Sequence, residues 1–203
     1  MDLAPRSLSW CLAAGVSFLL TFGALSVSAE PRNARPFNGS FQEWSLRGGP
    51  TLGGLDGGWT ADAGFRHSFP MYLGDTRLSY RFAGGGIDGE AHQIHGLHFT
   101  LGIHPFYLAL LSQGLVSHFL ASLHAELGLG AQLGVGEGVA AGFAPSVGAG
   151  FDLPITEANR GRGVWLNALY RRTWTTLSGP ESGRLHDHAF FVGLAWRING
   201  PLF

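Results

Sequence analysis

The stretch His118–Val135, HFLASLHAELGLGAQLGV, decides the fold that we predict for this chain. Its odd-numbered positions are all apolar, whereas its even-numbered positions are polar or small apart from Leu120. This period of two is typical of a β-strand with one apolar face and one polar, glycine-rich face. The stretch is much longer than the roughly 5–6 residues of an ordinary globular strand, which indicates the wall of a barrel.

A helical pattern competes with this strand over its first residues. Leucine and phenylalanine recur every four positions from residue 111 to residue 123, after Pro105, and this spacing predicts a short helix near 106–117. The half of the stretch from Leu127 onwards carries several glycines and is unlike a helix. The choice between helix and strand therefore stays open over 106–123.

The composition indicates that part of the surface does not face water. Only 13% of the 203 residues are charged, about half the roughly 25% typical of soluble domains. The net charge is −1, and no lysine is present, so no basic surface for nucleic acid is predicted. A soluble protein needs more charged side chains than this to cover its surface.

The N-terminus resembles an export signal. Arg6 precedes an apolar run over 11–25, and the small residues 27–29 then predict a signal peptide, 1–29, that is cleaved after Ala29. An uncleaved anchor is the alternative. Cys11 lies inside the predicted signal, so the exported chain uses neither disulfides nor thiol chemistry. Residues 30–42 are predicted to be a flexible lead-in, and 43–203 to be the barrel domain.

Eight alternating segments follow, and most are close to the 9–11 residues that a tilted strand needs to cross a bilayer. We predict an all-β fold, an eight-stranded antiparallel up-and-down transmembrane β-barrel with the short helix near 106–117. The predicted strands are 43–53, 58–68, 75–84, 94–104, 118–135, 139–153, 163–176 and 187–198.

Charged residues of these segments share the polar face. Five arginines and four carboxylates occupy it, and they are expected to pair inside the barrel because an unpaired charge is costly there. Glycines on the same face fit the narrow interior of an eight-stranded barrel. The predicted interior charge network is Glu43, Arg47, Asp62, Arg66, Arg81, Glu126, Asp152, Arg171 and Arg197.

Aromatic residues fall on the apolar face, many of them close to the ends of predicted strands. Tryptophan and tyrosine are enriched where a membrane meets water, since each ring is apolar but carries one polar group. If the apolar face points to lipid, these residues form interfacial girdles. The predicted girdle residues are Trp44, Trp59, Tyr80, Phe119, Phe151, Tyr170, Trp174, Phe190 and Trp196.

The export signal, the segments 78–82 (LSYRF) and 192–198 (VGLAWRI) and the terminal Phe203 resemble the small outer-membrane β-barrel family. The resemblance is architectural and covers essentially the whole exported chain. It implies the cell outer membrane of a double-membrane bacterium as the location. It also implies contact with the lipid bilayer and lipopolysaccharide, recognition by the barrel assembly machinery, and no cofactor.

The chain departs from that family at its end. In the family a terminal aromatic residue completes the last strand as an assembly signal, whereas here residues 199–202 separate Phe203 from the predicted strand. Pro201 cannot donate a hydrogen bond to a strand ladder. Either the last strand bends and continues to Phe203, or it ends at Ile198 and recognition tolerates the tail.

Ser122, His124 and Glu126 are the sharpest candidates for catalysis. A hydroxyl, an imidazole and a carboxylate are the parts of an acyl-transfer site, and some outer-membrane barrels modify lipid A with such residues. However, alternate residues of a strand lie side by side in one row, so these three side chains need not converge on a substrate. If the row points into the barrel, it also does not reach lipid. Packing of the interior is the favoured interpretation, and a lipid A-modifying hydrolase or acyltransferase is the alternative.

Four histidines are weak candidates for metal ligands. Neutral imidazoles suit zinc or copper, but no spacing in the chain matches a strong metal signature and the exported chain has no cysteine. We predict solvated or interior histidines and no metal. The candidates are His98, His104, His118 and His124.

These observations predict a small non-enzymatic outer-membrane barrel with a filled, charge-paired interior and no open pore. Its role would be structural, or one of interaction with a protein partner that the sequence does not identify. A secreted soluble ligand-binding barrel, with its apolar face turned inward, is a further alternative.

Overall fold

A computed structural model describes residues 40–69, 72–87, 90–111, 115–136, 138–156, 162–177 and 186–199. All of these residues belong to one compact unit, Ala34–Phe203. The predicted signal peptide, its cleavage after Ala29 and the terminal Phe203 lie outside the described residues. The predicted lead-in is described only from residue 40, and the first strand already begins at Phe41.

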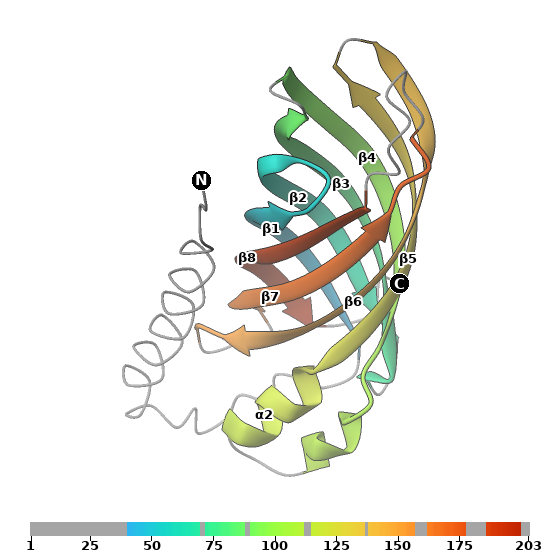
Figure 1. The fold of residues 1–203 in the computed structure, drawn as a ribbon. Coiled ribbons are helices and arrows are strands. Elements are labelled where there is room, and N and C mark those ends of the chain that lie inside the picture. The colour runs from blue at the N-terminus through green and yellow to red at the C-terminus, as the bar shows by residue number, and fades with distance from the viewer. Residues whose placement is uncertain are drawn as a thin grey trace, which may run out of the picture. The chain divides into compact units, whose positions relative to one another are not determined.

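Eight strands form one closed barrel (Figure 1), in which each strand pairs antiparallel with its neighbours in sequence and the last strand pairs with the first. The predicted up-and-down barrel is therefore confirmed. The strands are β1 (Phe41–Leu52), β2 (Asp56–Ser68), β3 (Gly74–Ile87), β4 (Glu90–Ile103), β5 (His124–Val135), β6 (Val139–Pro154), β7 (Arg162–Trp174) and β8 (His186–Asn199).

The predicted start of the long strand at His118 was wrong. Residues Leu115–Ser122 form the helix α2, after a short 3-10 helix, η2 (Tyr107–Leu111), and β5 begins only at His124. The apolar spacing of four therefore prevails over the spacing of two in this region. The Ser122 hydroxyl donates to the backbone oxygen of Phe119 at 2.8 Å, in the last turn of α2. None of the described helices is long and apolar enough to cross a membrane.

Asp56-Gly57-Gly58 has the sequence of a tight turn, but the turn between β1 and β2 precedes it, at 53–55. Gly53 and Gly54 have φ of 80° and 78°, a left-handed conformation that glycine adopts without a steric penalty. Gly57 also has a positive φ, of 60°, and the pairing of β2 with β3 shifts register between Asp56 and Trp59. The signal over 56–58 thus marks an irregularity inside β2.

The two ends of the barrel differ. Figure 1 shows the β3–β4 and β5–β6 connections at one end, which we call the hairpin end, and α2 at the other. The second end, which we call the terminal end, carries the start of β1, the end of β8 and the segment between β4 and β5 with η2 and α2. Backbone hydrogen bonds tie this segment to the neighbouring β2–β3 turn, since the His104 amide donates to the Leu73 oxygen at 3.1 Å.

Candidate functional site

The alternation along each strand separates a charged interior from an apolar outer wall. In β1, Glu43 and Arg47 are buried, whereas the alternate residues Trp44 and Leu46 are exposed. The register keeps outward residues opposite each other, so Trp44 of β1 pairs with Trp196 of β8. A water-soluble barrel has the opposite arrangement, with its apolar side chains inside.

Six arginines and six carboxylates are buried among the described residues, so the formal charges of the interior balance. The arginines are Arg47, Arg66, Arg77, Arg81, Arg171 and Arg197, and the carboxylates are Glu43, Asp62, Asp75, Glu126, Asp152 and Asp187. Every predicted member of the charge network belongs to this set. Isolated ions would be very costly in such an interior, so the contacts between them decide whether the arrangement is stable.

Three of these residues were missed from the sequence. Asp75 and Arg77 alternate with outward side chains of β3 in the same phase as Arg81. The alternation of inward and outward residues along β3 was therefore the signal from which Asp75 and Arg77 could have been predicted. Asp187 lies between two histidines at the beginning of β8. Few residues of the strand precede it, so the alternation did not indicate which way its side chain points.

The ion pairs nearest the terminal end bring together five strands. Asp152 Oδ2 of β6 accepts hydrogen bonds from Arg66 Nη1 of β2 at 2.8 Å and from Arg197 Nη2 of β8 at 2.9 Å. Arg197 Nη2 also donates to Glu43 Oε2 of β1 at 2.5 Å, and Arg66 Nη2 donates to Asp75 Oδ2 of β3 at 2.7 Å. Charge-assisted hydrogen bonds of this kind are the strong ones in a medium of low dielectric constant.

Two further groups of ion pairs lie deeper in the barrel. Asp62 Oδ1 accepts from Arg47 Nη2 at 2.9 Å and from Arg77 Nη2 at 2.7 Å. Glu126 Oε1 accepts from both Nε and Nη2 of Arg171, at 2.9 and 2.7 Å. Each of these carboxylates therefore has at least one charged partner with good geometry.

Arg81 forms the ion pair closest to the hairpin end. Its Nη2 donates to Asp187 Oδ2 at 2.5 Å, and its Nε and Nη1 donate to the hydroxyls of Thr60 and Thr173 at 3.0 and 3.1 Å. The guanidinium thus uses donors on three of its nitrogens. Arg81 lies on β3, and its partners lie on β2, β7 and β8. Its hydrogen bonds therefore connect opposite sides of the barrel.

An apolar cluster lies beyond Arg81, at the hairpin end. Leu177, which follows β7, packs there with Leu55, Ala83 and Ile94. The backbone holds Leu177 in place, because the neighbouring Thr176 amide donates to the Phe143 oxygen at 2.9 Å.

Aromatic side chains are buried at the terminal end. Tyr72 is fully buried, and its ring centroid lies 5.4 Å from that of Phe41 and 4.0 Å from that of His104. The Arg197 guanidinium carbon lies 3.9 Å from the ring centroids of both Phe41 and Trp165, a distance at which a cation–π attraction operates. Burial raises the pKa of the Tyr72 phenol above its usual range, so this group stays neutral.

The three candidate catalytic residues each have separate partners. Ser122 donates to the Phe119 oxygen and accepts from the Asp152 amide at 3.1 Å. His124 Nδ1 lies 3.0 Å from the backbone oxygen of Ser122, and the Glu126 carboxylate binds Arg171 as described above. In this arrangement the hydroxyl, the imidazole and the carboxylate have structural hydrogen bonds, and the contacts described for them do not join the hydroxyl to the imidazole or the imidazole to the carboxylate.

The candidate metal ligands are spread over the barrel. His98 and His104 are six positions apart on or next to β4, about 20 Å along an extended strand, and His118 lies on α2. The ring centroids of His104 and His124 are 5.5 Å apart. Across the described ranges, no group of three histidine, cysteine or acidic side chains is arranged to hold a metal ion.

His104 is the histidine with the closest charged neighbours. Its Nε2 lies 2.7 Å from Asp75 Oδ2 and 3.1 Å from Arg66 Nη2, and its Nδ1 lies 3.3 Å from the Ala121 oxygen. Burial lowers the pKa of His104, and the hydrogen bond to Asp75 opposes this shift. Burial also lowers the pKa of His118, which is half-buried on α2.

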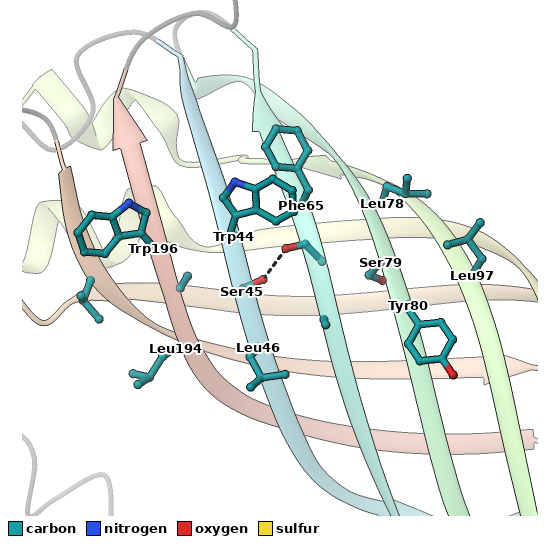
Figure 2. Close-up of a pocket in the computed structure, with 14 residues that line it drawn as sticks. Trp44, Ser45, Leu46, Phe65, Leu78, Ser79, Tyr80, Leu97, Leu194 and Trp196 are labelled. Carbon is teal, nitrogen blue, oxygen red and sulfur yellow. Dashed lines mark hydrogen bonds between the residues drawn. The ribbon is translucent and has the colours of Figure 1, made fainter.

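The outer wall carries the predicted girdle residues, except that Phe119 lies on α2. Trp44, Trp59, Tyr80, Phe190 and Trp196 are exposed, whereas the others are half-buried. A shallow groove of about 900 Å³ lies on this wall. The indoles of Trp44 and Trp196 and several leucine side chains flank it (Figure 2). The lining also includes the small residues Ser45, Ala63, Gly64, Ser79 and Ala195.

A few polar side chains interrupt the apolar wall towards the hairpin end. The Tyr170 hydroxyl lies 2.5 Å from His188 Nδ1. The Arg172 guanidinium carbon lies 5.0 Å from the ring centroid of Trp174, whereas its neighbour Arg171 points inward. Residues with an apolar stem and a polar end suit the boundary between a membrane and water.

No known protein family and no curated protein matches the sequence. Among solved structures, the barrel is similar to Neisserial surface protein A, with a TM-score of 0.53 at 9% identity, over 79% of this chain and 97% of that one. The outer membrane protein OprG from Pseudomonas aeruginosa aligns over 83% of this chain and 100% of its own, at 10% identity and a TM-score of 0.36. The similarity to Neisserial surface protein A is one of fold alone, and the chain has the architecture of the small eight-stranded outer-membrane β-barrels.

Proposed function

We propose that the chain is a non-enzymatic outer-membrane protein whose barrel spans the lipid bilayer around a filled, charge-paired interior. The observation that carries this proposal is the inverted distribution of side chains. Leu46, Leu127 and Phe143 on the outer wall are each 65% exposed, while twelve charged side chains of the described ranges are buried inside. Apolar area on this scale is stable against hydrocarbon and unfavourable in water.

The dimensions of the strands support a membrane span. The strands contain 12 to 16 residues, and about 9–11 residues suffice for a tilted strand to cross the hydrocarbon layer. A soluble ligand-binding barrel of this sequence would expose the same wall to water and bury the ions instead of an apolar core. The outer wall therefore favours the membrane protein over the secreted binding protein.

The outer membrane is favoured by three features taken together: the predicted export signal, the closed barrel and the similarity in fold to a barrel named as a surface protein. Lipopolysaccharide and the barrel assembly machinery are the partners that follow from this location. The exposed guanidinium of Arg172 beside Trp174 supports contact with anionic headgroups.

The role that we propose is structural or one of interaction, without catalysis and without an open pore. The ion pairs fill the interior, and buried side chains close it at both ends. Ser122, His124 and Glu126 each have a structural hydrogen-bond partner, which supports a role without catalysis.

Fractionation of cells with gel electrophoresis tests the proposal. We expect the protein in the outer-membrane fraction, and we expect unheated samples to migrate differently from boiled samples, since a closed barrel resists detergent at room temperature. A sample unfolded in urea before loading is the control for the boiled form. Recovery of the protein from the culture supernatant, with migration that heating does not change, would refute the membrane location.

A further inference from the structure

The segment 105–123 leaves large apolar side chains uncovered outside the strands. Val116 on α2 is 72% exposed, Leu108 on η2 is 59% exposed and Phe106 before η2 is 52% exposed. This segment lies at the terminal end of the barrel, beyond the ends of β4 and β5. An exposed apolar cluster of this kind marks a surface that contacts something other than water.

The same segment contains no Asp, Glu, Lys or Arg, and His118 is its only side chain that titrates near neutral pH. Connections of soluble proteins usually carry charges, because they run over a surface that faces water. A protein partner that binds by charge complementarity has nothing to recognise here. An uncharged and apolar segment fits the hydrocarbon boundary of a lipid leaflet.

α2 is fixed to the barrel in a way that continues the outer wall. Its last residues, Ala121 and Ser122, are fully buried, and the Asp152 amide of β6 donates to Ser122. On the outward phase of β6, the Phe151 ring meets the Phe119 ring of α2 edge to face, with centroids 5.3 Å apart. The apolar side chains of α2 therefore extend the surface that the strands present to lipid.

From this geometry we propose that the described parts of this segment, 105–111 and 115–123, form an interfacial anchor, which inserts Phe106, Leu108 and Val116 into the lipid leaflet at the terminal end. The inference rests on the proposed membrane span of the barrel. The anchor fixes how deep the barrel sits, since withdrawing these side chains from lipid would expose them to water. Phe69, Leu73 and Ile155 are further exposed apolar residues at this end, and they belong to the same boundary.

Site-directed spin labelling of the full chain tests the anchor. With Cys11 replaced by serine, single cysteines are introduced as Val116→Cys and, independently, Leu108→Cys, and each variant is labelled with a nitroxide in vesicles of phosphatidylcholine and phosphatidylglycerol. Collision with oxygen, which concentrates in lipid, is compared with collision with a water-soluble nickel chelate. We expect oxygen to relax both labels several-fold more effectively than the chelate.

Two control positions separate the anchor from the membrane span. Leu129→Cys places a label on the outer wall of β5, and Gly138→Cys places one in the β5–β6 connection, where a Cβ meets nothing within 4 Å. If Leu129→Cys favours oxygen while the labels at 108 and 116 favour the chelate, the anchor is overturned and the membrane span stands. If Leu129→Cys itself favours the chelate, the membrane span fails.

A third pattern would also overturn the anchor. Labels at 108 and 116 that are immobile and shielded from both reagents would show that protein covers the segment, either a second copy of this chain or another polypeptide. Labels that match Leu129→Cys support the anchor.

Discussion

Three arginines converge on the interior carboxylate Asp62. Its Oδ1 binds Arg47 and Arg77, and Arg171 Nη1 lies 3.7 Å from its Oδ2. Asp62→Asn keeps the shape of the side chain but leaves these cations uncompensated. Removing one partner of a buried ion pair typically costs about 3–5 kcal/mol, so we expect urea titration in detergent micelles to show a loss of stability of that size.

A charge change on the outer wall provides the control for Asp62→Asn. Arg172 is exposed and has no buried carboxylate among its described contacts, so Arg172→Gln is expected to change the free energy of unfolding by less than about 1 kcal/mol. Equal effects of the two substitutions would contradict the view that Asp62 holds the interior charges together.

His104 makes the stability of the terminal end depend on pH. Its pKa is lower in the folded protein than the value of about 6.5 in an unfolded chain. The unfolded state then binds the proton more readily, so the contribution of His104 is present above about pH 6.5 and is lost as the pH falls through the folded pKa. We expect the free energy of unfolding to drop more steeply between pH 7 and pH 5 in the natural chain than in His104→Gln. Identical slopes would contradict this.

At the scale of the elements, the seam between β1 and β8 depends on Gly193. A Cβ built on Gly193 would lie 2.0 Å from the Leu46 oxygen and 2.5 Å from Arg47 Cα, so the backbones would have to move apart. We expect Gly193→Val to abolish the heat-modifiable band, because the last strand cannot close the barrel. Gly138→Ala is the matched control, since its Cβ meets nothing within 4 Å. A heat-modifiable Gly193→Val barrel would show that the seam tolerates the clash.

The strands could be predicted from the sequence wherever the apolar residues follow only one spacing. Alternation fixed the orientation of Arg47 and Asp62 as soon as the apolar face was assigned to the outside. It did not fix the boundary of β5, because Phe119 and Leu123 satisfy a spacing of two and a spacing of four at once. The contact of Phe119 with Phe151 of β6 favours the helix over this region. A contact between residues so far apart cannot be read from one sequence.

The partners within the interior could not be predicted either. Strand phase shows that a side chain points inward, but its neighbours depend on the tilt and closure of the whole barrel. Glu43 and Arg197 bind each other although 154 positions separate them. For the same reason, nothing in the sequence placed Leu177 at the hairpin end beside Leu55 and Ile94.

For the whole molecule, the filled interior that we propose predicts the absence of ion conduction. An ion would have to displace the Leu177 cluster at one end, the aromatic side chains at the other end and the ion pairs between them. We expect no conductance steps when the purified barrel is inserted into planar bilayers, under conditions in which an open porin conducts. Regular steps from the folded protein would contradict a filled interior.

The ion pairs around Asp152 also determine how the barrel reaches its final state. Their members come from β1, β2, β3, β6 and β8, so these pairs form together only when the first and last strands meet. A partly closed intermediate in the membrane would carry unpaired ions into a medium of low dielectric constant, which is strongly unfavourable. Folding and insertion are therefore expected to be a single cooperative event, in which the meeting of the first and last strands completes both.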